Sequence, residues 1–145
     1  PYPSQTENLH HEVELVVAIG KGGSDIAVAD ALDHVWGYGV GLDLTRRDIQ
    51  SRDGKPWEIA KAFDRSFPVG PLSPASETGH LDRGRIWLSV NGEVVQDSDL
   101  GELIWTIPEI ISRLSAFFAL SPGDRLVATV EGLQPLTVAI GPREK

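Results

Sequence analysis

The amino-acid sequence predicts a mainly β protein of the α+β class, with one long and one short helix. Three observations favour this class. Apolar and polar residues alternate near the N-terminus, an Asn91-Gly92 pair separates two strand-like runs, and one extended helical pattern starts at Ile107-Pro108. A chain of 145 residues can bury a core, so we expect residues 1–145 to form a single domain.

The first strand is expected over residues 9–19, before the glycine cluster of residues 20–23. Successive side chains of a strand point to opposite faces, so one face should carry His10, Glu12 and Glu14. The glycine cluster lacks the GxxxxGK[ST] spacing of a phosphate-binding loop, and we expect a turn there. A short helix should follow. Its N-cap would be Ser24 or Asp25, and apolar residues recur at helical spacing at Val28, Ala31, Leu32 and Val35.

A second strand, expected over residues 36–44, has an unusual face made of Gly37, Gly39, Gly41 and Asp43. Glycine weakens a strand, so three glycines on one face indicate either a close approach of other chain segments or room for a ligand. In the first case Asp43 would cap the next turn, and in the second it would border the ligand site. The residue pattern leaves both interpretations open.

Two cationic segments follow. Arg46 and Arg47 precede Asp48, a combination that is common on solvated surfaces and that also suits recognition of a carboxylate substrate. Lys61 has apolar neighbours in the sequence. It is either a lysine extending from the edge of the core or a desolvated cation held in a site.

The second half of the chain begins with a loop-rich stretch, residues 66–84. A β-hairpin is expected around Asn91-Gly92, because this pair tolerates the positive φ angles of a type I′ turn. The long helix should end at residues 121–124, with one apolar face formed by Ile107, Ile110, Ile111, Leu114, Phe117 and Phe118. Two closing strands, Leu126–Val130 and Leu136–Ile140, should flank a turn at Gly132–Pro135.

Composition excludes several kinds of chemistry. The absence of cysteine excludes disulfides, thiolate zinc sites and a cysteine nucleophile, and neither GxSxG nor GxGxxG occurs. A net charge of −8 argues against nucleic-acid binding, and no apolar run approaches the ~20 residues of a membrane span. What remains is an oxygen-rich site for a hard divalent cation, formed by Glu12, Glu14 and an aspartate. The solvated edge of a half-buried strand explains the same acidic alternation.

Five segments together resemble the fumarylacetoacetate hydrolase family, in the family's order and over most of the chain. They are Asn8–Lys21, Gly37–Gln50, Pro56–Asp64, Leu88–Gln96 and the helical stretch Ile104–Leu120. The resemblance implies a β-roll of mixed sheets in a cytoplasmic, usually dimeric enzyme. Within the family, residues 36–48 and 1–12 are most similar to the fumarylpyruvate hydrolase branch.

The resemblance also assigns roles to individual residues. It implies that Glu12, Glu14 and Asp43 bind Mg²⁺ or Mn²⁺ and that Lys61 is the catalytic lysine. The arginine and glutamine that contact substrate would be Arg47 and Gln50. His10 would then either be structural or support a metal ligand from outside the ligand set, since the family's set of metal ligands is complete without it.

The function implied is metal-dependent hydrolysis of a carbon–carbon bond in a 3-acylpyruvate, with fumarylpyruvate giving fumarate and pyruvate. The small-molecule substrate would be a 2-oxo acid, and no nucleic acid or membrane would be a partner. An alternative is decarboxylation or tautomerisation of oxaloacetate at the same site. A second alternative, of another class, is a non-catalytic β-roll that serves in binding or assembly.

Three departures from the family pattern concern segments that line its active site. The GTPxGVGP loop that usually follows the long helix is missing, and the connection from Gln50 to Pro56 is shorter than usual. The family's N-terminal His-Glu dyad would precede Pro1, and methionine is absent even at position 1. We therefore expect the printed chain either to be a fragment or to have residues left out. If it were complete, we would expect metal binding with poor turnover.

Overall fold

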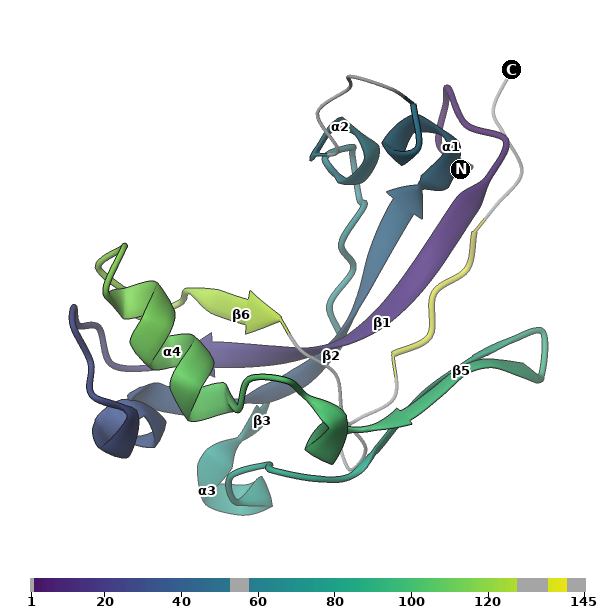
Figure 1. Ribbon diagram of the computed structural model, residues 1–145. Helices are drawn as coiled ribbons and strands as arrows, with labels where there is room; N and C mark the ends of the chain where they lie inside the picture. Colours follow the sequence, from purple (N-terminus) through teal and green to yellow (C-terminus); the bar gives the residue numbers. More distant parts are fainter. Residues whose placement is uncertain (1, 53–57, 128–135, 141–145) are drawn as a thin grey trace.

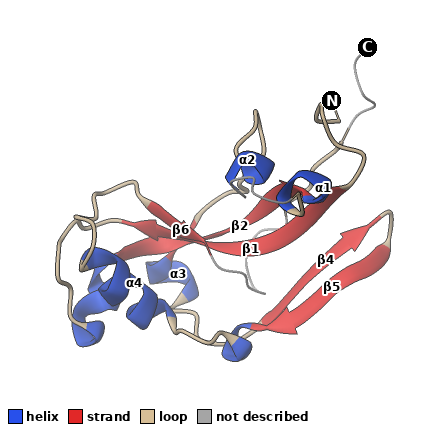
Figure 2. Cartoon of the chain, turned by 45° about the horizontal axis from the view of Figure 1, so that its top comes forward, coloured by secondary structure: helices blue, strands red, loops and turns tan. Residues whose placement is uncertain are grey.

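The computed structural model describes residues 2–52, 58–127 and 136–140. It is built from antiparallel strands with few helices, which agrees with the predicted α+β class (Figures 1 and 2). The elements in chain order are β1 (Leu9–Ile19), the 3-10 helix η1 (Val28–His34), β2 (Val35–Arg46), α1 (Arg47–Gln50), α2 (Glu58–Lys61), β3 (Ser73–Pro74), α3 (Ala75–Thr78), β4 (Arg85–Val90), β5 (Glu93–Asp99), the 3-10 helix η2 (Leu100–Glu102), α4 (Ile107–Ser115) and β6 (Arg125–Val127).

The two long strands β1 and β2 organise the molecule. They pair antiparallel in a sheet of order β3-β2-β1-β6, while β4 and β5 form a separate hairpin. The short helices α1 and α2 lie near one end of β1 and β2, and α4 lies near the other end (Figure 1). Every strand pairing among the described residues is antiparallel. Within the described ranges, none of the helices has the length and apolar character needed to cross a bilayer.

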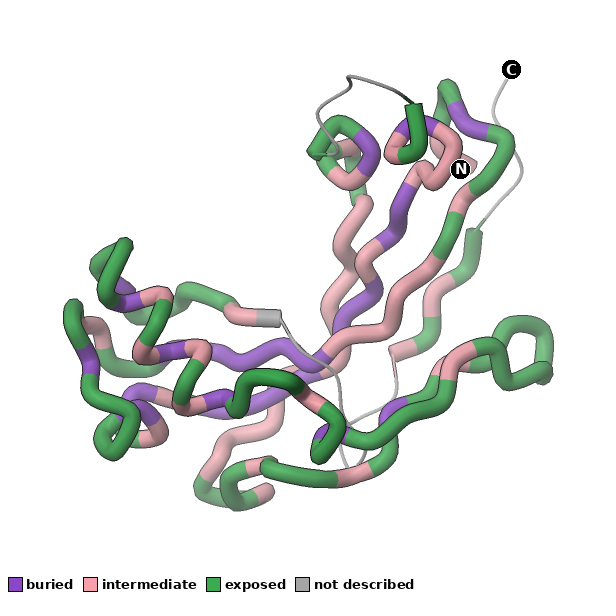
Figure 3. Tube along the Cα trace, viewed as in Figure 1, coloured by how far each residue is buried: buried purple, intermediate pink, exposed green. Residues whose placement is uncertain are grey.

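The hydrophobic core is concentrated at the α4 end of β1 (Figure 3). The odd-numbered face of β1 packs there, with Leu15 fully buried and Val17 almost so. Ile107 and Ile111 of α4 belong to the same cluster, so the face of β1 opposite the glutamates packs into the core. Toward α1 the residues of β1 are only partly buried, and this half of the strand carries the acidic residues.

The glycine face of β2 is covered by the segment of residues 66–74. A Cβ atom at Gly37 would lie 2.2 Å from the carbonyl oxygen of Ser73, and one at Gly41 would lie 2.7 Å from Cζ of Phe67. The contact at Gly37 is with backbone and excludes a side chain there, whereas a side chain at Gly41 would require the Phe67 ring to move, so glycine is required at Gly37 for the close approach of this segment. The first of the two interpretations is therefore correct for the glycines. For Asp43 that interpretation is wrong, because the Asp43 side chain contacts Lys61 instead of capping a turn.

The predicted hairpin is confirmed. Asn91 and Gly92 have φ angles of 53° and 91°, as a type I′ turn requires, and β4 and β5 flank them. The start of the long helix is also confirmed at Ile107-Pro108. A capping box reinforces it, because Thr106 and Glu109 exchange side-chain and backbone hydrogen bonds.

The end of that helix was predicted incorrectly. Helix α4 stops at Ser115, and the rings of Phe117 and Phe118 are exposed instead of lying on its buried face. The chain leaves the helix because Leu120 bonds to Gly23 in both directions, with N···O distances of 2.8 and 3.0 Å. The amides of Phe117 and Phe118 still donate to the carbonyl of Leu114, both at 2.9 Å, and the long-range bonds of Leu120 follow this last turn.

Three further predictions need correction or fall outside the described residues. The short helix is a 3-10 helix whose N-cap position is Ala27; Asp25 has a φ of 52°, which does not suit an N-cap. The first closing strand is present as β6, while its remainder and the turn at Gly132–Pro135 lie outside the described ranges. The second, Leu136–Ile140, has no strand pairing among the described residues. The one-turn helices α1, α2 and α3 are too short to leave a periodic pattern in the sequence.

Candidate metal centre

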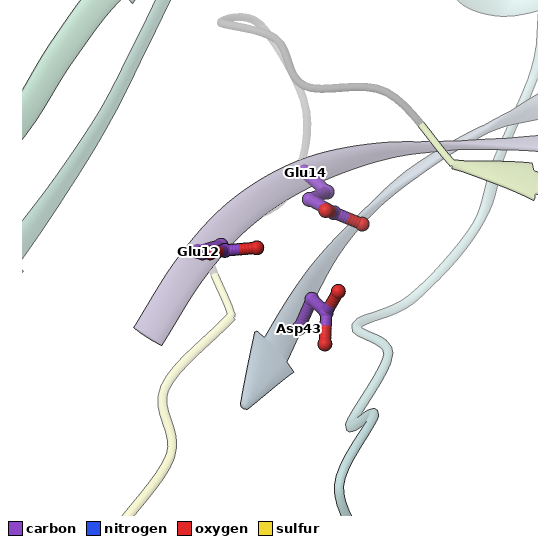
Figure 4. Close-up of side chains that lie close together, drawn as sticks. All are labelled: Glu12, Glu14 and Asp43. Atoms are coloured by element: carbon purple, nitrogen blue, oxygen red, sulfur yellow. The ribbon is translucent and has the colours of Figure 1, made fainter. Parts of the chain in front are cut away.

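Three carboxylates converge between β1 and β2. Glu12 and Glu14 extend from β1 and Asp43 extends from β2, and the three side chains approach one another (Figure 4). One oxygen from each lies within 4.8 Å of the others. Alternation places Glu12 and Glu14 on one face of β1, and the strand register places Asp43 directly opposite Glu12. Each of the three residues is half-buried.

Lys61, the last residue of α2, reaches into this group of carboxylates. Its ammonium donates hydrogen bonds to Oε2 of Glu12 at 2.8 Å, to the Asp43 carboxylate and to Oγ1 of Thr45 at 2.9 Å. Its side chain is 20% exposed. Of the two interpretations of this residue, the structure supports a cation held in a site.

Arg47, the first residue of α1, holds the other side of Glu12. Its guanidinium donates one hydrogen bond to the Glu12 carboxylate and one to the side-chain oxygen of Gln50, one helical turn further on. Arg46 points elsewhere. Its guanidinium donates to the carbonyl oxygen of Ile59 at 2.6 Å and lies over the ring of Phe63.

The electrostatic environment differs among the acidic residues. Burial, together with the nearby negative charges of Asp43 and Glu12, raises the pKa of Glu14 to about 7, although Lys61 opposes the shift. Burial also acts to raise the pKa of Glu12, but the hydrogen bonds from Lys61 and Arg47 outweigh it and the net pKa is lowered. Of these two glutamates, Glu14 is therefore the one whose charge is less compensated.

The contact with Glu12 also shifts the pKa of Lys61. Burial lowers the pKa of its ammonium, but hydrogen bonds to Asp43 and Glu12 outweigh burial and the net pKa is raised. Lys61 therefore keeps its positive charge at neutral pH.

The donor set fits a hard divalent cation. Carboxylate oxygens are the ligands that Mg²⁺ and Mn²⁺ prefer, and here three of them gather with one oxygen of each in close range. Two cationic side chains, Lys61 and Arg47, face three carboxylates, and the raised pKa of Glu14 reflects its burial together with the remaining repulsion from Asp43 and Glu12. A divalent cation would relieve this repulsion.

The six residues that the sequence singled out lie in one place. Glu12, Glu14 and Asp43 form the acidic group, Lys61 and Arg47 contact it directly, and Gln50 contacts Arg47. His10 is exposed on β1 and stands outside the acidic group, as expected of a residue that is not a ligand.

Two neighbours of this group escaped sequence reasoning. Thr45 is fully buried and accepts a hydrogen bond from Lys61, and Gln96 of β5 accepts one from the backbone of Val13. Thr45 could have been found, because strand alternation places it on the same face as Asp43. No signal in the sequence indicates Gln96, because its partner lies 83 residues away.

The sheet built around β1 and β2, with three carboxylates between these strands, is the architecture of a metal-binding α+β domain. Residues 1–138 match the family described as fumarylacetoacetate (FAA) hydrolase C-terminal. The chain belongs to the fumarylacetoacetate hydrolase family.

Individual relatives support this assignment. The chain is 36% identical over 163 residues to a fumarylpyruvate hydrolase of Ralstonia sp, covering 99% of this chain and 84% of that protein. It is 42% identical over 138 residues to the mitochondrial oxaloacetate tautomerase FAHD1 of Mus musculus, covering 92% of this chain and 62% of that protein. These two relatives carry different reaction names.

A solved structure confirms the fold. The fumarylpyruvate hydrolase from Pseudomonas aeruginosa, in complex with Mn²⁺ and pyruvate, superposes with a TM-score of 0.83 and is 56% identical. The match covers 90% of this chain and 60% of that one. The chain thus spans less than two thirds of several proteins that it resembles.

Proposed function

We propose that this chain forms the metal-binding part of a hydrolase that cleaves a carbon–carbon bond in a 3-acylpyruvate, with fumarylpyruvate as the substrate. The observation that carries the proposal is the acidic group of Glu12, Glu14 and Asp43, with Lys61 bound to it. The fumarylpyruvate hydrolases of Ralstonia and Pseudomonas among its relatives support the choice of substrate.

The proposed cofactor is Mg²⁺ or Mn²⁺, held by Glu12, Glu14 and Asp43. When bound, such a cation supplies Lewis-acid chemistry and a template for the 2-oxo acid end of the substrate. The related Pseudomonas structure, which contains Mn²⁺ and pyruvate, supports this choice of cofactor and ligand class.

The chain's own cations would handle the charges of the reaction. Hydrolysis adds the oxygen of water to the distal carbonyl carbon and breaks the bond from that carbon to the methylene group. Fumarate leaves as the acid, and pyruvate leaves as an enolate that takes up a proton at carbon. Lys61 carries a fixed positive charge at this position, where it would stabilise the negative charge as it develops.

Substrate binding is assigned to Arg47 and Gln50. Their side chains already contact each other beside Glu12, so a guanidinium and an amide stand together next to the acidic group. Such a pair suits a carboxylate or carbonyl oxygen of the substrate.

Tautomerisation or decarboxylation of oxaloacetate is the second candidate function. The similarity to the mouse oxaloacetate tautomerase, at 42% identity, supports it. The hydrolysis of fumarylpyruvate and these reactions of oxaloacetate all pass through the enolate of a 2-oxo acid, so they would use the same residues. Turnover of fumarylpyruvate and of oxaloacetate, compared on the full-length protein, distinguishes the two.

Calorimetric titration of Mn²⁺ tests the step that both functions share. We expect the wild type to bind, Glu12→Ala to lose binding, and Glu77→Ala, an exposed control on α3, to bind as the wild type does. Absence of binding to the wild type would leave the non-catalytic module as the better description.

Three further expectations belong to the proposal. They are a single catalytic domain over residues 1–145, a homodimer and a location in the cytoplasm, and all rest on the family resemblance. Sedimentation equilibrium of the full-length protein tests the homodimer directly.

A further inference from the structure

The peptide group that follows Glu12 is held by a side chain from a distant element. The N–H of Val13 donates a hydrogen bond to Oε1 of Gln96 on β5, with a donor–acceptor distance of 3.0 Å. Val13 lies between the two glutamates of the acidic group, and Gln96 belongs to the separate β4–β5 hairpin. The bond therefore joins the hairpin to the segment of β1 that carries two of the three carboxylates.

This bond restrains the direction of the Glu12 side chain. The Val13 N–H is part of the planar peptide unit that begins at the carbonyl of Glu12. Fixing the plane of that unit restrains ψ of Glu12, which sets the direction of the Cα–Cβ bond of Glu12 relative to the plane. A side chain that holds this plane thus acts on Glu12 without touching its carboxylate.

Asp43 on the neighbouring strand is held in a different way. The residues on either side of it donate backbone hydrogen bonds to the segment that covers β2, Leu42 to Pro68 at 3.1 Å and Leu44 to Ser66 at 2.9 Å. On β1, the side chain of Gln96 accepts a hydrogen bond from the peptide group between the two glutamates.

The bond lies beside an open pocket of about 240 Å³. Val13 of β1 and residues of the hairpin and η2, among them Ile86, Gln96 and Leu100, line this pocket. The hydrogen bond is thus a direct, directional contact between the hairpin and β1 at this point.

We propose that Gln96 is a positioning residue of the metal centre, which sets the orientation of Glu12 relative to Glu14 before the cation binds. This inference rests on the proposed function, because it requires that the acidic group binds a divalent cation. Residues that orient metal ligands typically change metal affinity by about 10–100-fold when they are replaced.

The test measures Mn²⁺ affinity by calorimetry on the full-length protein. Gln96→Met keeps the length of the side chain and removes the oxygen acceptor, and we expect it to weaken Mn²⁺ binding about tenfold. Gln96→Glu keeps an oxygen at the same reach and should bind within about threefold of the wild type. Val94→Ala, an exposed position on the same strand, is the matched control and should leave the affinity unchanged.

Hydrogen exchange of the Val13 amide gives a second, independent measurement. We expect this amide to exchange faster in Gln96→Met than in the wild type without Mn²⁺, while core amides such as that of Val17 keep their protection. A loss of protection throughout the chain would show a general structural role and overturn the proposal. Should Gln96→Met not fold, Gln96→Asn, which is too short to reach Val13, replaces it with the same expected results.

The outcomes separate this inference from the proposed function. A wild type that does not bind Mn²⁺ overturns the proposed function and this inference with it. A wild type that binds Mn²⁺, together with variants that lack the acceptor and bind equally well, overturns the role of Gln96 alone.

Discussion

Glu12 on β1 lies directly opposite Asp43 on β2, and the ammonium of Lys61 hydrogen-bonds to both carboxylates. Two carboxylates on directly opposite residues of paired strands repel each other unless a cation lies between them. Lys61 supplies that cation from a one-turn helix that begins only at Glu58. The acidic pair and the lysine are therefore one electrostatic unit, and a change in any member should alter the other two.

Replacement of Asp43 should abolish the metal site while preserving the fold. Replacing a residue that merely orients a ligand costs about 10–100-fold in metal affinity, so Asp43→Asn, which alters a ligand, should weaken Mn²⁺ binding by about 100-fold or more. Asp64→Asn, an exposed aspartate that follows α2, serves as the control and should bind normally. Calorimetry measures both affinities, and normal binding by Asp43→Asn would remove this aspartate from the ligand set.

Glu14→Gln should stabilise the metal-free protein at alkaline pH. Burial and the charges of Asp43 and Glu12 raise the pKa of Glu14 to about 7 from 4.5, so the folded state retains this proton where the unfolded state has lost it. Through this group, the free energy of unfolding falls as the pH rises from about 4.5 to about 7. The glutamine variant lacks this loss and should be more stable than the wild type by up to about 3 kcal/mol at pH 8.

Denaturant titrations in the presence of a chelator, at pH 5 and pH 8, measure the effect of Glu14→Gln. The difference between variant and wild type should be small at pH 5 and large at pH 8. An equal difference at both pH values would show that the carboxylate of Glu14 does not titrate between them.

Lys61→Met should separate the electrostatic role of the lysine from metal binding. Without the ammonium, Glu12 and Asp43 repel each other, so the metal-free protein should lose about 1–3 kcal/mol of stability. Saturating Mn²⁺ should recover most of this loss. Turnover should remain about 100-fold or more below that of the wild type, because a positive charge aimed at the developing enolate is gone.

Thermal unfolding with and without Mn²⁺, and initial rates on fumarylpyruvate, measure these two effects of Lys61→Met. Lys21→Met, on the turn after β1, is the control for the loss of one lysine charge. A Lys61→Met protein with unchanged turnover would disprove the assigned role in catalysis.

Thr45→Val should impair turnover more than it impairs folding. The hydroxyl of Thr45 is fully buried and accepts a hydrogen bond from Lys61, so valine fills the space but leaves the ammonium less well oriented. We expect a stability loss of about 1 kcal/mol and a fall in kcat of about tenfold, with little change in KM. Thr45→Ser retains the hydroxyl and should recover most of the kcat; equal kcat values for the two variants would contradict this role.

Local patterns in the sequence predicted the elements whose structure is set by neighbouring residues. The alternation of residues 9–19 predicted β1, Asn91-Gly92 predicted the hairpin, and Ile107-Pro108 predicted the start of α4. In each case φ and ψ preferences or side-chain periodicity act over a few residues. The end of α4 could not be predicted in this way, because it depends on backbone bonds between Leu120 and Gly23, far apart in the chain.

In the candidate site, too, local patterns and the family resemblance predicted some residues, and long-range contacts determined others. Alternation places Glu12 and Glu14 on one face, and the resemblance of the sequence to the family identified Asp43, Lys61, Arg47 and Gln50. Thr45 was accessible from the alternation that starts at Asp43. Gln96 was not, because the bond to Val13 joins two separate sheets.

By itself the sequence determined the long strands, the hairpin turn, the start of the helix and the residues of the acidic group. Only the tertiary structure decided which partners the cationic side chains contact: Lys61 and Arg47 bind the Glu12 carboxylate, a contact that neither the residue pattern nor the resemblance specified. Arg46 and Arg47 are adjacent in the chain, yet Arg47 contacts Glu12 while Arg46 contacts the backbone of Ile59. The physical reason is that a strand fixes only the face of each side chain, whereas its partner depends on elements brought close by folding, such as α1, α2 and the β4–β5 hairpin.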